Sequence, residues 1–169
     1  MTRWFIGIGS NIEPRRNVPL ILEALAEMVG EVVISPIVET EPVDMRSGNG
    51  FLNLAVCVPW SGSATELKSE CVAIEERLGR DRGHAQSKYR DRTADLDLLF
   101  EIRDKEAIDI GVLPTESYMR PQVETLCGVL GILPMPKSPS IGIVLPMRHR
   151  PIGPDSDCLT MSTLERIDP

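Results

Sequence analysis

The sequence lacks the features that mark several common classes of binding protein. It has no excess of basic residues, because its formal net charge is −7, and this argues against a general nucleic-acid binder. It has no apolar stretch long enough to cross a membrane. It lacks the third glycine of a dinucleotide-binding fingerprint, because Ile12 follows Gly7-Ile8-Gly9-Ser10-Asn11. No C-x-x-C pair occurs among its cysteines, which are Cys57, Cys71, Cys127 and Cys158.

Widely spaced cysteines favour reduced thiols over a zinc site or a redox motif, and they fit a reducing cytoplasm. The chain has 169 residues, of which 42% are apolar, and this is enough for one core without disulfides. We therefore expect a cytoplasmic monomer with a single domain over residues 1–169. Residues 134–169 are expected to form an irregular, proline-rich tail of that domain, since six prolines lie between Pro134 and Pro154.

Hydrophobic periodicity predicts an alternation of strands and helices. A buried strand leads to a glycine-containing turn, and a helix with one apolar face ends before Gly30. Two strands then form an antiparallel pair, and a second helix is capped by Ser63 or Thr65 and ends at Gly79. The order predicts an α+β fold, a ferredoxin-like sandwich with a mainly antiparallel sheet. The predicted strands cover 3–9, 31–40, 51–59 and 94–100, and the first helix covers 16–29.

Two carboxylates lie on the last of these strands. Asp95 and Asp97 are two residues apart, so both side chains are predicted to leave the same face. Paired carboxylates suit two magnesium ions that are shared with phosphate oxygens. A solvated strand face is the alternative, because most charged residues are simply exposed.

A basic segment precedes the two aspartates directly. It contains six of the 18 basic residues within sixteen positions, and these are Arg77, Arg80, Arg82, Lys88, Arg90 and Arg92. Guanidinium groups bind phosphate oxygens in pairs, and phosphoryl transfer depends mainly on positioning and charge neutralisation. The segment therefore predicts a polyphosphate site, although a solvated loop that balances nearby carboxylates is the alternative.

With these residues assembled, the chain resembles the 6-hydroxymethyl-7,8-dihydropterin pyrophosphokinases, which transfer the pyrophosphate of ATP to a pterin alcohol. The resemblance covers about residues 1 to 100 and then fades. The segment from Arg92 to Phe100, with its double aspartate, is the most specific part. Four stretches carry the resemblance, and they are 5–11, 51–56, 75–80 and 92–100.

The resemblance implies roles for individual residues. Asp95 and Asp97 would ligate two Mg²⁺ ions that bridge ATP, and catalysis would rest on Arg80, Arg82 and Arg92. These arginines would also contact the nucleotide, together with Tyr89, Leu98 and Arg120. The pterin would be bound by Thr40, Val43, Phe51 and Asn53. Loops 43–50 and 80–92 would close over the substrates.

Several positions depart from the family pattern. Tyr89-Arg90-Asp91 stands where the family usually has Trp-Gly-Pro, and Thr115 stands where a histidine is expected. Val72 replaces a polar residue. The segment 118–123 lacks the phenylalanine expected after its arginine and has Gln122 there. Three alternatives therefore stay open: a pterin pyrophosphokinase that releases AMP, a related pyrophosphokinase for another alcohol, and a non-catalytic descendant that binds metal and nucleotide.

Overall fold

The computed structural model describes residues 2–42, 48–81, 91–103, 108–134, 142–147 and 150–164. Its helices are α1 (Pro14–Val29), α2 (Ala64–Arg77), the 3-10 turn η2 (Ile110–Val112), α3 (Arg120–Val129) and α4 (Met161–Leu164). Its strands are β1 (Thr2–Ser10), β2 (Glu31–Ile34), β3 (Val38–Thr40), β4 (Phe51–Pro59), β5 (Asp95–Arg103), β6 (Leu145–Met147), β7 (Arg150–Ile152) and β8 (Asp157–Thr160).

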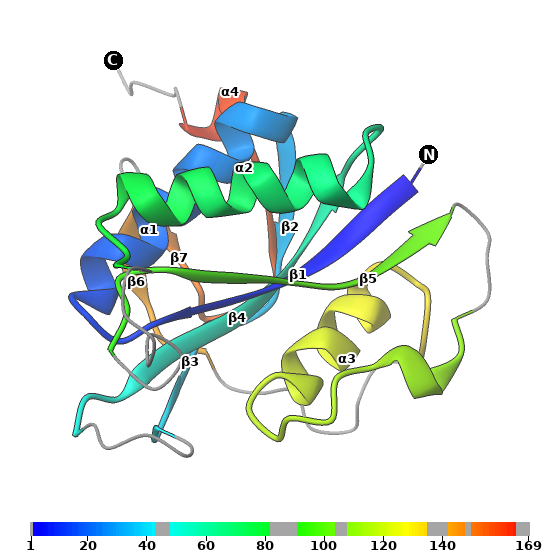
Figure 1. Ribbon diagram of the computed structural model, residues 1–169. Coiled ribbons are helices and arrows are strands. Elements are labelled where there is room, and N and C mark those ends of the chain that lie inside the picture. Colours follow the sequence, from blue (N-terminus) through cyan, green and yellow to red (C-terminus); the bar gives the residue numbers. More distant parts are fainter. Residues whose placement is uncertain are drawn as a thin grey trace.

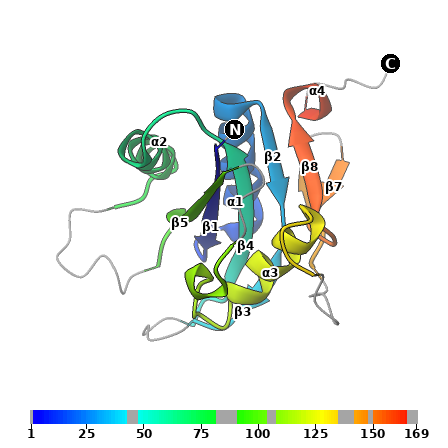
Figure 2. The same cartoon turned by 90° about the vertical axis from the view of Figure 1, so that its right-hand side faces the viewer.

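The main sheet is antiparallel throughout, with the strand order β5-β1-β4-β2-β8 and with β3 also paired to β4. Figure 2 shows β5 and β8 at opposite edges of this sheet. Strands β1, β2, β4 and β5 with helices α1 and α2 follow the predicted order of strand, helix, strand, strand, helix, strand. The ferredoxin-like α+β prediction is therefore confirmed.

Helices cover both faces of the sheet (Figure 1). Helices α1 and α2 pack on one face around a core that includes Ile6, Leu54 and Leu96. Helix α3 covers the other face, where Phe5 and Phe100 stack with their ring centroids 4.5 Å apart. The two faces matter for the site because alternate residues of each central strand point to opposite helices.

The helix boundaries follow from local capping chemistry. Pro14 lies in the first turn of α1, where a missing N–H costs nothing, and Gly30 ends the helix with φ 80°. Ser63 caps α2 in a reciprocal pair, since its hydroxyl accepts from the Glu66 N–H and the Glu66 carboxylate accepts from the Ser63 N–H. Of the two predicted caps for this helix, Ser63 is therefore the one used.

The predicted strand 31–40 is interrupted in the structure. Pro36 has no N–H to donate, and the chain forms β2 and β3 on either side of it. Ser35 maintains the contact with β4, because its hydroxyl oxygen accepts from the Ala55 N–H at 2.9 Å and its own N–H donates to the Ala55 carbonyl. Both halves still pair antiparallel with β4, as predicted for this hairpin.

Part of the proline-rich segment is regular. Strands β6 and β7 form a separate two-stranded sheet, and β8 extends the main sheet by pairing with β2. Leu159 of β8 is fully buried in the core beneath α1 and α2. The sequence predicted an irregular tail in this segment and did not predict its contribution to the main sheet.

Candidate functional site

The predicted metal ligands and the described acceptor residues lie on one face of the sheet, and β1 lies between the strands β5 and β4. Asp95 of β5 pairs with Gly9 of β1, which pairs with Asn53 of β4. Two residues farther along β5, Asp97 pairs with Gly7. The two glycines place no side chain between the aspartates and β4, and this face is the one that α3 covers farther along the sheet (Figure 1).

A β-bulge lets β5 direct both its two carboxylates and, farther along, Phe100 to the α3 side of the sheet. The register shifts between Phe5 and Ile6 of β1, so that Leu99 of β5 is the additional residue. Leu98 packs with the α1 and α2 core, whereas Leu99 and Phe100 both pack toward α3. The strand thus presents carboxylates on the α3 side at its start, and the apolar side chains of Leu99 and Phe100 on that same side farther along.

Two guanidinium groups hold Asp95. Arg80 donates to Oδ1 of Asp95 and to the Ala94 carbonyl, and Arg92 donates to Oδ2. All three side chains are mostly buried, with exposed fractions of 9% for Arg80, 14% for Arg92 and 16% for Asp95. The site therefore concentrates positive charge around one carboxylate, in a chain that is acidic as a whole.

Asp97 is in a different environment. Its side chain is 68% exposed, and Nζ of Lys68 lies 3.5 Å from its Oδ1. The Lys68 ammonium also donates to the Leu96 carbonyl at 2.6 Å. Asp97 therefore faces solvent with one cation beside it, whereas Asp95 is enclosed by arginines.

A buried glutamate on α2 supports this arrangement. Glu75 is fully buried, and its Oε1 accepts from the Leu96 N–H at 2.7 Å and lies 3.7 Å from Nη1 of Arg80. Glu75 and Lys68 therefore satisfy the N–H and the carbonyl of the residue between the two aspartates. Because β5 is an edge strand, these contacts from α2 occupy part of its otherwise unpaired side.

The predicted acceptor residues lie beside the arginines. The guanidinium carbon of Arg92 is 5.6 Å from the Phe51 ring centroid, which is a cation–π distance. Nδ2 of Asn53 donates to Oγ1 of Thr40 at 2.7 Å, and Thr40 pairs with Phe51 in the β3–β4 ladder. Thr40, Phe51 and Asn53 are thus brought together next to Arg92.

The turn before α3 approaches the same face. A Cβ atom on Gly7 would lie 3.1 Å from Cε of Met119, so Met119 covers this glycine closely. The pKa of Tyr118 is raised mainly by burial and then by the negative charges of Glu116, Asp97 and Asp95, and Arg92 opposes the rise. Tyr118 and Met119 therefore border the aspartates at the point where the sequence departs from the family pattern.

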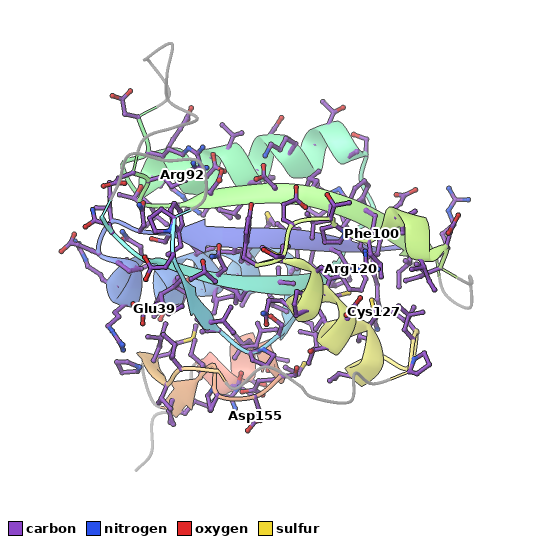
Figure 3. The ribbon with its side chains drawn as sticks, turned by 90° about the horizontal axis from the view of Figure 1, so that it is seen from below. Glu39, Arg92, Phe100, Arg120, Cys127 and Asp155 are labelled. Carbon is purple, nitrogen blue, oxygen red and sulfur yellow. The ribbon has the colours of Figure 1, made fainter. Side chains whose placement is uncertain are left out.

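The structure does not bring every predicted residue to this place. The Leu98 side chain packs into the α1 and α2 core, on the face opposite the aspartates, so any nucleotide contact would have to come from its main chain. Arg120 begins α3 and pairs with Glu124 of the same helix at 2.8 Å. In Figure 3, Arg120 lies toward Phe100, away from Arg92. The predicted residues Val43, Arg82 and Tyr89, with most of the two predicted lid loops, lie outside the described residues.

Sequence reasoning missed Glu75 and Lys68. Glu75 belongs to the stretch 75–80 that carries the family resemblance but was given no role in the site, and Lys68 was not singled out. A signal was available, because Glu75 falls among the apolar positions Leu67, Cys71 and Ile74 of α2, where a charged residue needs a buried partner.

Comparison with known proteins places the chain in a family. The family model of the 7,8-dihydro-6-hydroxymethylpterin-pyrophosphokinases matches residues 5–137. The chain belongs to this family. The match continues past residue 100, beyond the part in which the resemblance was readable from motifs.

Two curated relatives carry the name 2-amino-4-hydroxy-6-hydroxymethyldihydropteridine pyrophosphokinase, and they come from Porphyromonas gingivalis strains ATCC 33277 and W83. Each is 32% identical to this pyrophosphokinase-family chain over 97 residues. The matched region covers 56% of this chain and 66% of each relative, just under two thirds. Among the described residues, no helix has the length and apolar character needed to span a bilayer.

Proposed function

We propose that this chain transfers the pyrophosphate group of ATP to the hydroxymethyl group of 6-hydroxymethyl-7,8-dihydropterin and releases AMP, a step of folate biosynthesis. The observation that carries the proposal is the position of Arg92, which contacts both Asp95 and Phe51. Arg92 therefore lies between the carboxylate proposed to bind metal and the aromatic ring proposed to stack on a flat acceptor. Membership of the pyrophosphokinase family supports the same reaction.

Asp95 and Asp97 are the proposed ligands of two Mg²⁺ ions. Magnesium prefers a few carboxylates and fills its other positions with water and substrate phosphate, and its bound form would neutralise charge on the transferred group. The donor set fits, because both aspartates offer hard oxygen ligands and Asp97 is open to solvent. Within the described part of the chain, no group of three or more His, Cys, Asp or Glu side chains forms a closed metal site.

The arginines around Asp95 suggest that metal and nucleotide bind together. Both oxygens of Asp95 accept hydrogen bonds from guanidinium groups, so a metal ligand role requires these bonds to rearrange. Triphosphate oxygens are strong partners for the same guanidiniums. We infer that Arg80 and Arg92 shift toward phosphate as Asp95 becomes a ligand. Arg82 and Tyr89 stay proposed nucleotide contacts from the sequence alone.

The acceptor is proposed to bind over β1 and β4. Phe51 offers a ring face, and the Asn53 side chain, fixed by Thr40, offers polar groups to a heterocycle. The hydroxymethyl oxygen would form a bond to the β-phosphorus of ATP as the bond from that phosphorus to the bridging oxygen of AMP breaks, and the alcohol would lose its proton. Val43 and the main chain of Leu98 are further proposed substrate contacts, and Arg120 would have to leave its pair with Glu124 to become one.

An AMP-release assay tests the reaction directly. The protein is mixed with ATP, MgCl₂ and 6-hydroxymethyl-7,8-dihydropterin, and AMP is measured with and without the pterin. Pterin-dependent AMP that disappears when MgCl₂ is replaced by EDTA, and in Asp97→Ala, is the expected result. Absence of AMP from the wild-type protein under all these conditions would refute the proposed activity.

A different alcohol is the second candidate acceptor. Gln122, which replaces the aromatic expected by resemblance, is buried in α3, so this position supplies no ring face. If ATP and Mg²⁺ bind but only other alcohols yield AMP, the related pyrophosphokinase is the correct reading. If ATP binds and no alcohol reacts, the chain is a non-catalytic descendant of the family.

We further propose that the protein is a cytoplasmic monomer with one domain over residues 1–169, whose partners are ATP and the pterin alcohol. The four cysteines support a reducing location, because all of them lie in the described part of the chain and none forms a disulfide. The pairing of β8 with β2 supports a single domain, because it joins the proline-rich segment to the main sheet.

A further inference from the structure

Asp91 bridges two segments that are far apart in the sequence. Its Oδ1 accepts from Nδ2 of Asn11 at 2.7 Å, and its Oδ2 accepts from Nδ2 of Asn49 at 2.6 Å. Asn11 follows β1, Asn49 lies two residues before Phe51, and Asp91 directly precedes Arg92. One carboxylate thus links the end of β1, the start of β4 and the phosphate-binding arginine.

Asn11 is the rigid end of this bridge. It is only 4% exposed, and its Oδ1 accepts from the Arg92 N–H at 2.8 Å. The main-chain N–H groups of Asn11 and Ile12 both donate to the Arg92 carbonyl, at 3.1 and 3.2 Å. The main chain of Arg92 is therefore fixed from both sides by the buried end of β1.

Asn49 is the other end of the bridge, and it is exposed. Its bond to Asp91 ties residues 48–50 to this fixed point, and residues 48–50 lead directly into Phe51. The bridge thus runs in parallel with the direct contact between the Arg92 guanidinium and the Phe51 ring. The bridge and the ring contact, together with a 3.5 Å hydrogen bond from Nδ2 of Asn11 to the Asn49 carbonyl, hold the phosphate-binding side and the acceptor side of the site in register.

We propose that Asp91 is a positioning residue that sets the acceptor residue Phe51 relative to Arg92 through Asn11 and Asn49. The catalytic consequence rests on the proposed function, but the bridge itself does not. A proline at this position, as the family pattern leads one to expect, has no carboxylate and cannot form the two bonds. The bridge is therefore a feature of this chain.

The proposal predicts a specific kinetic pattern. Asn49→Ala removes the side-chain bond from the acceptor side to Asp91, and it changes an exposed side chain. Asp91→Asn leaves one acceptor oxygen where two are needed. Hydrogen bonds to a charged group support effects of about tenfold or more on an equilibrium. We expect each variant to raise KM for the pterin about tenfold and to change KM for ATP less than twofold.

The double variant and a control make the pattern diagnostic. Asn49→Ala with Asp91→Asn should lose no more than either single variant, since both break the same bridge. Asp155→Asn, an exposed carboxylate far from Arg92 in Figure 3, should match the wild type. Additive losses in the double variant, or equal rises in both KM values, would show that Asp91 acts on overall structure and would overturn the proposal.

Amide hydrogen exchange without ligands tests the bridge independently of any reaction. In Asn49→Ala and Asp91→Asn, peptides that cover 48–53 should exchange about tenfold faster than in the wild type, and peptides from α2 should be unchanged. Unchanged exchange at 48–53 would overturn the proposal even if the enzyme is active. Failure of the wild type to release AMP would refute the proposed function, and the exchange result would then decide the bridge alone.

Discussion

Replacement of Glu75 by alanine tests how much the contact from α2 to β5 stabilises the protein. The change removes the acceptor of the buried Leu96 N–H, and an unsatisfied buried donor costs about 1–3 kcal/mol. The change also removes one carboxylate near Arg80, but Arg80 keeps its hydrogen bonds to Asp95 and to the Ala94 carbonyl. The stability lost at Arg80 should therefore be well below the cost of breaking a buried ion pair completely, which is about 3–5 kcal/mol. We expect the free energy of unfolding to fall by about 2–4 kcal/mol.

Urea unfolding followed by circular dichroism measures this change as a lower midpoint at unchanged slope. Glu75→Gln keeps an acceptor oxygen for Leu96, so it should cost about 1 kcal/mol. Glu70→Ala, an exposed glutamate on the same helix, should change stability by less than about 0.5 kcal/mol. Equal losses for the glutamine and alanine variants, or a loss under about 1 kcal/mol for alanine, would refute the assigned role of the Leu96 bond.

Further predictions concern the aspartates, Arg92 and the thiols. Asp97→Ala should abolish Mg²⁺-dependent ATP binding in calorimetry, and its stability should change by about 0.5 kcal/mol or less because the side chain is exposed. Asp95→Ala should lower the free energy of unfolding by about 3 kcal/mol, because two guanidinium groups lose their carboxylate. ATP binding that persists in Asp97→Ala would contradict the metal role. Arg92→Ala should lower kcat by about 10³-fold or more, and wild-type turnover would show that Arg92 is only structural. Burial raises the pKa of the Cys57 thiol from 9.0 to about 12, so the folded state favours the neutral thiol. The resulting stabilisation is complete below pH 9 and falls as pH rises from 9 toward 12. The urea midpoint should therefore be lower at pH 10.5 than at pH 8, and this difference should be smaller in Cys57→Ala. At pH 8 a thiol reagent should label exposed Cys158 first, and rapid labelling of more than one thiol would contradict the burial of Cys57, Cys71 and Cys127.

The elements of the fold were largely readable from local patterns. Hydrophobic periodicity located α1 and α2, which bury one apolar face, and short apolar runs located β1 and β4, which are buried on both faces. Capping residues located the helix ends, as Ser63 and Gly30 show. The strand with Asp95 and Asp97 was predicted from alternation, and its two carboxylates lie on one face of the sheet as expected.

Features that depend on pairing between distant segments were not readable. The pairing of β8 with β2 joins residues that are more than a hundred positions apart, and its four residues carry too short a pattern to predict a partner. The bulge at Leu99 also depends on the partner strand β1, since alternation in β5 alone gives no sign of it.

The sequence by itself determined the chemistry of the site: two carboxylates on one strand, an arginine-rich segment before them, and the motifs of the pyrophosphokinase family. Only the tertiary structure decided which partners these groups take. It enclosed Asp95 between Arg80 and Arg92, left Asp97 to solvent, and brought buried Glu75 to the strand between them. Residue type and spacing are local properties of the chain, whereas burial and charge pairing arise only when distant segments pack together, and so the sequence alone does not specify them.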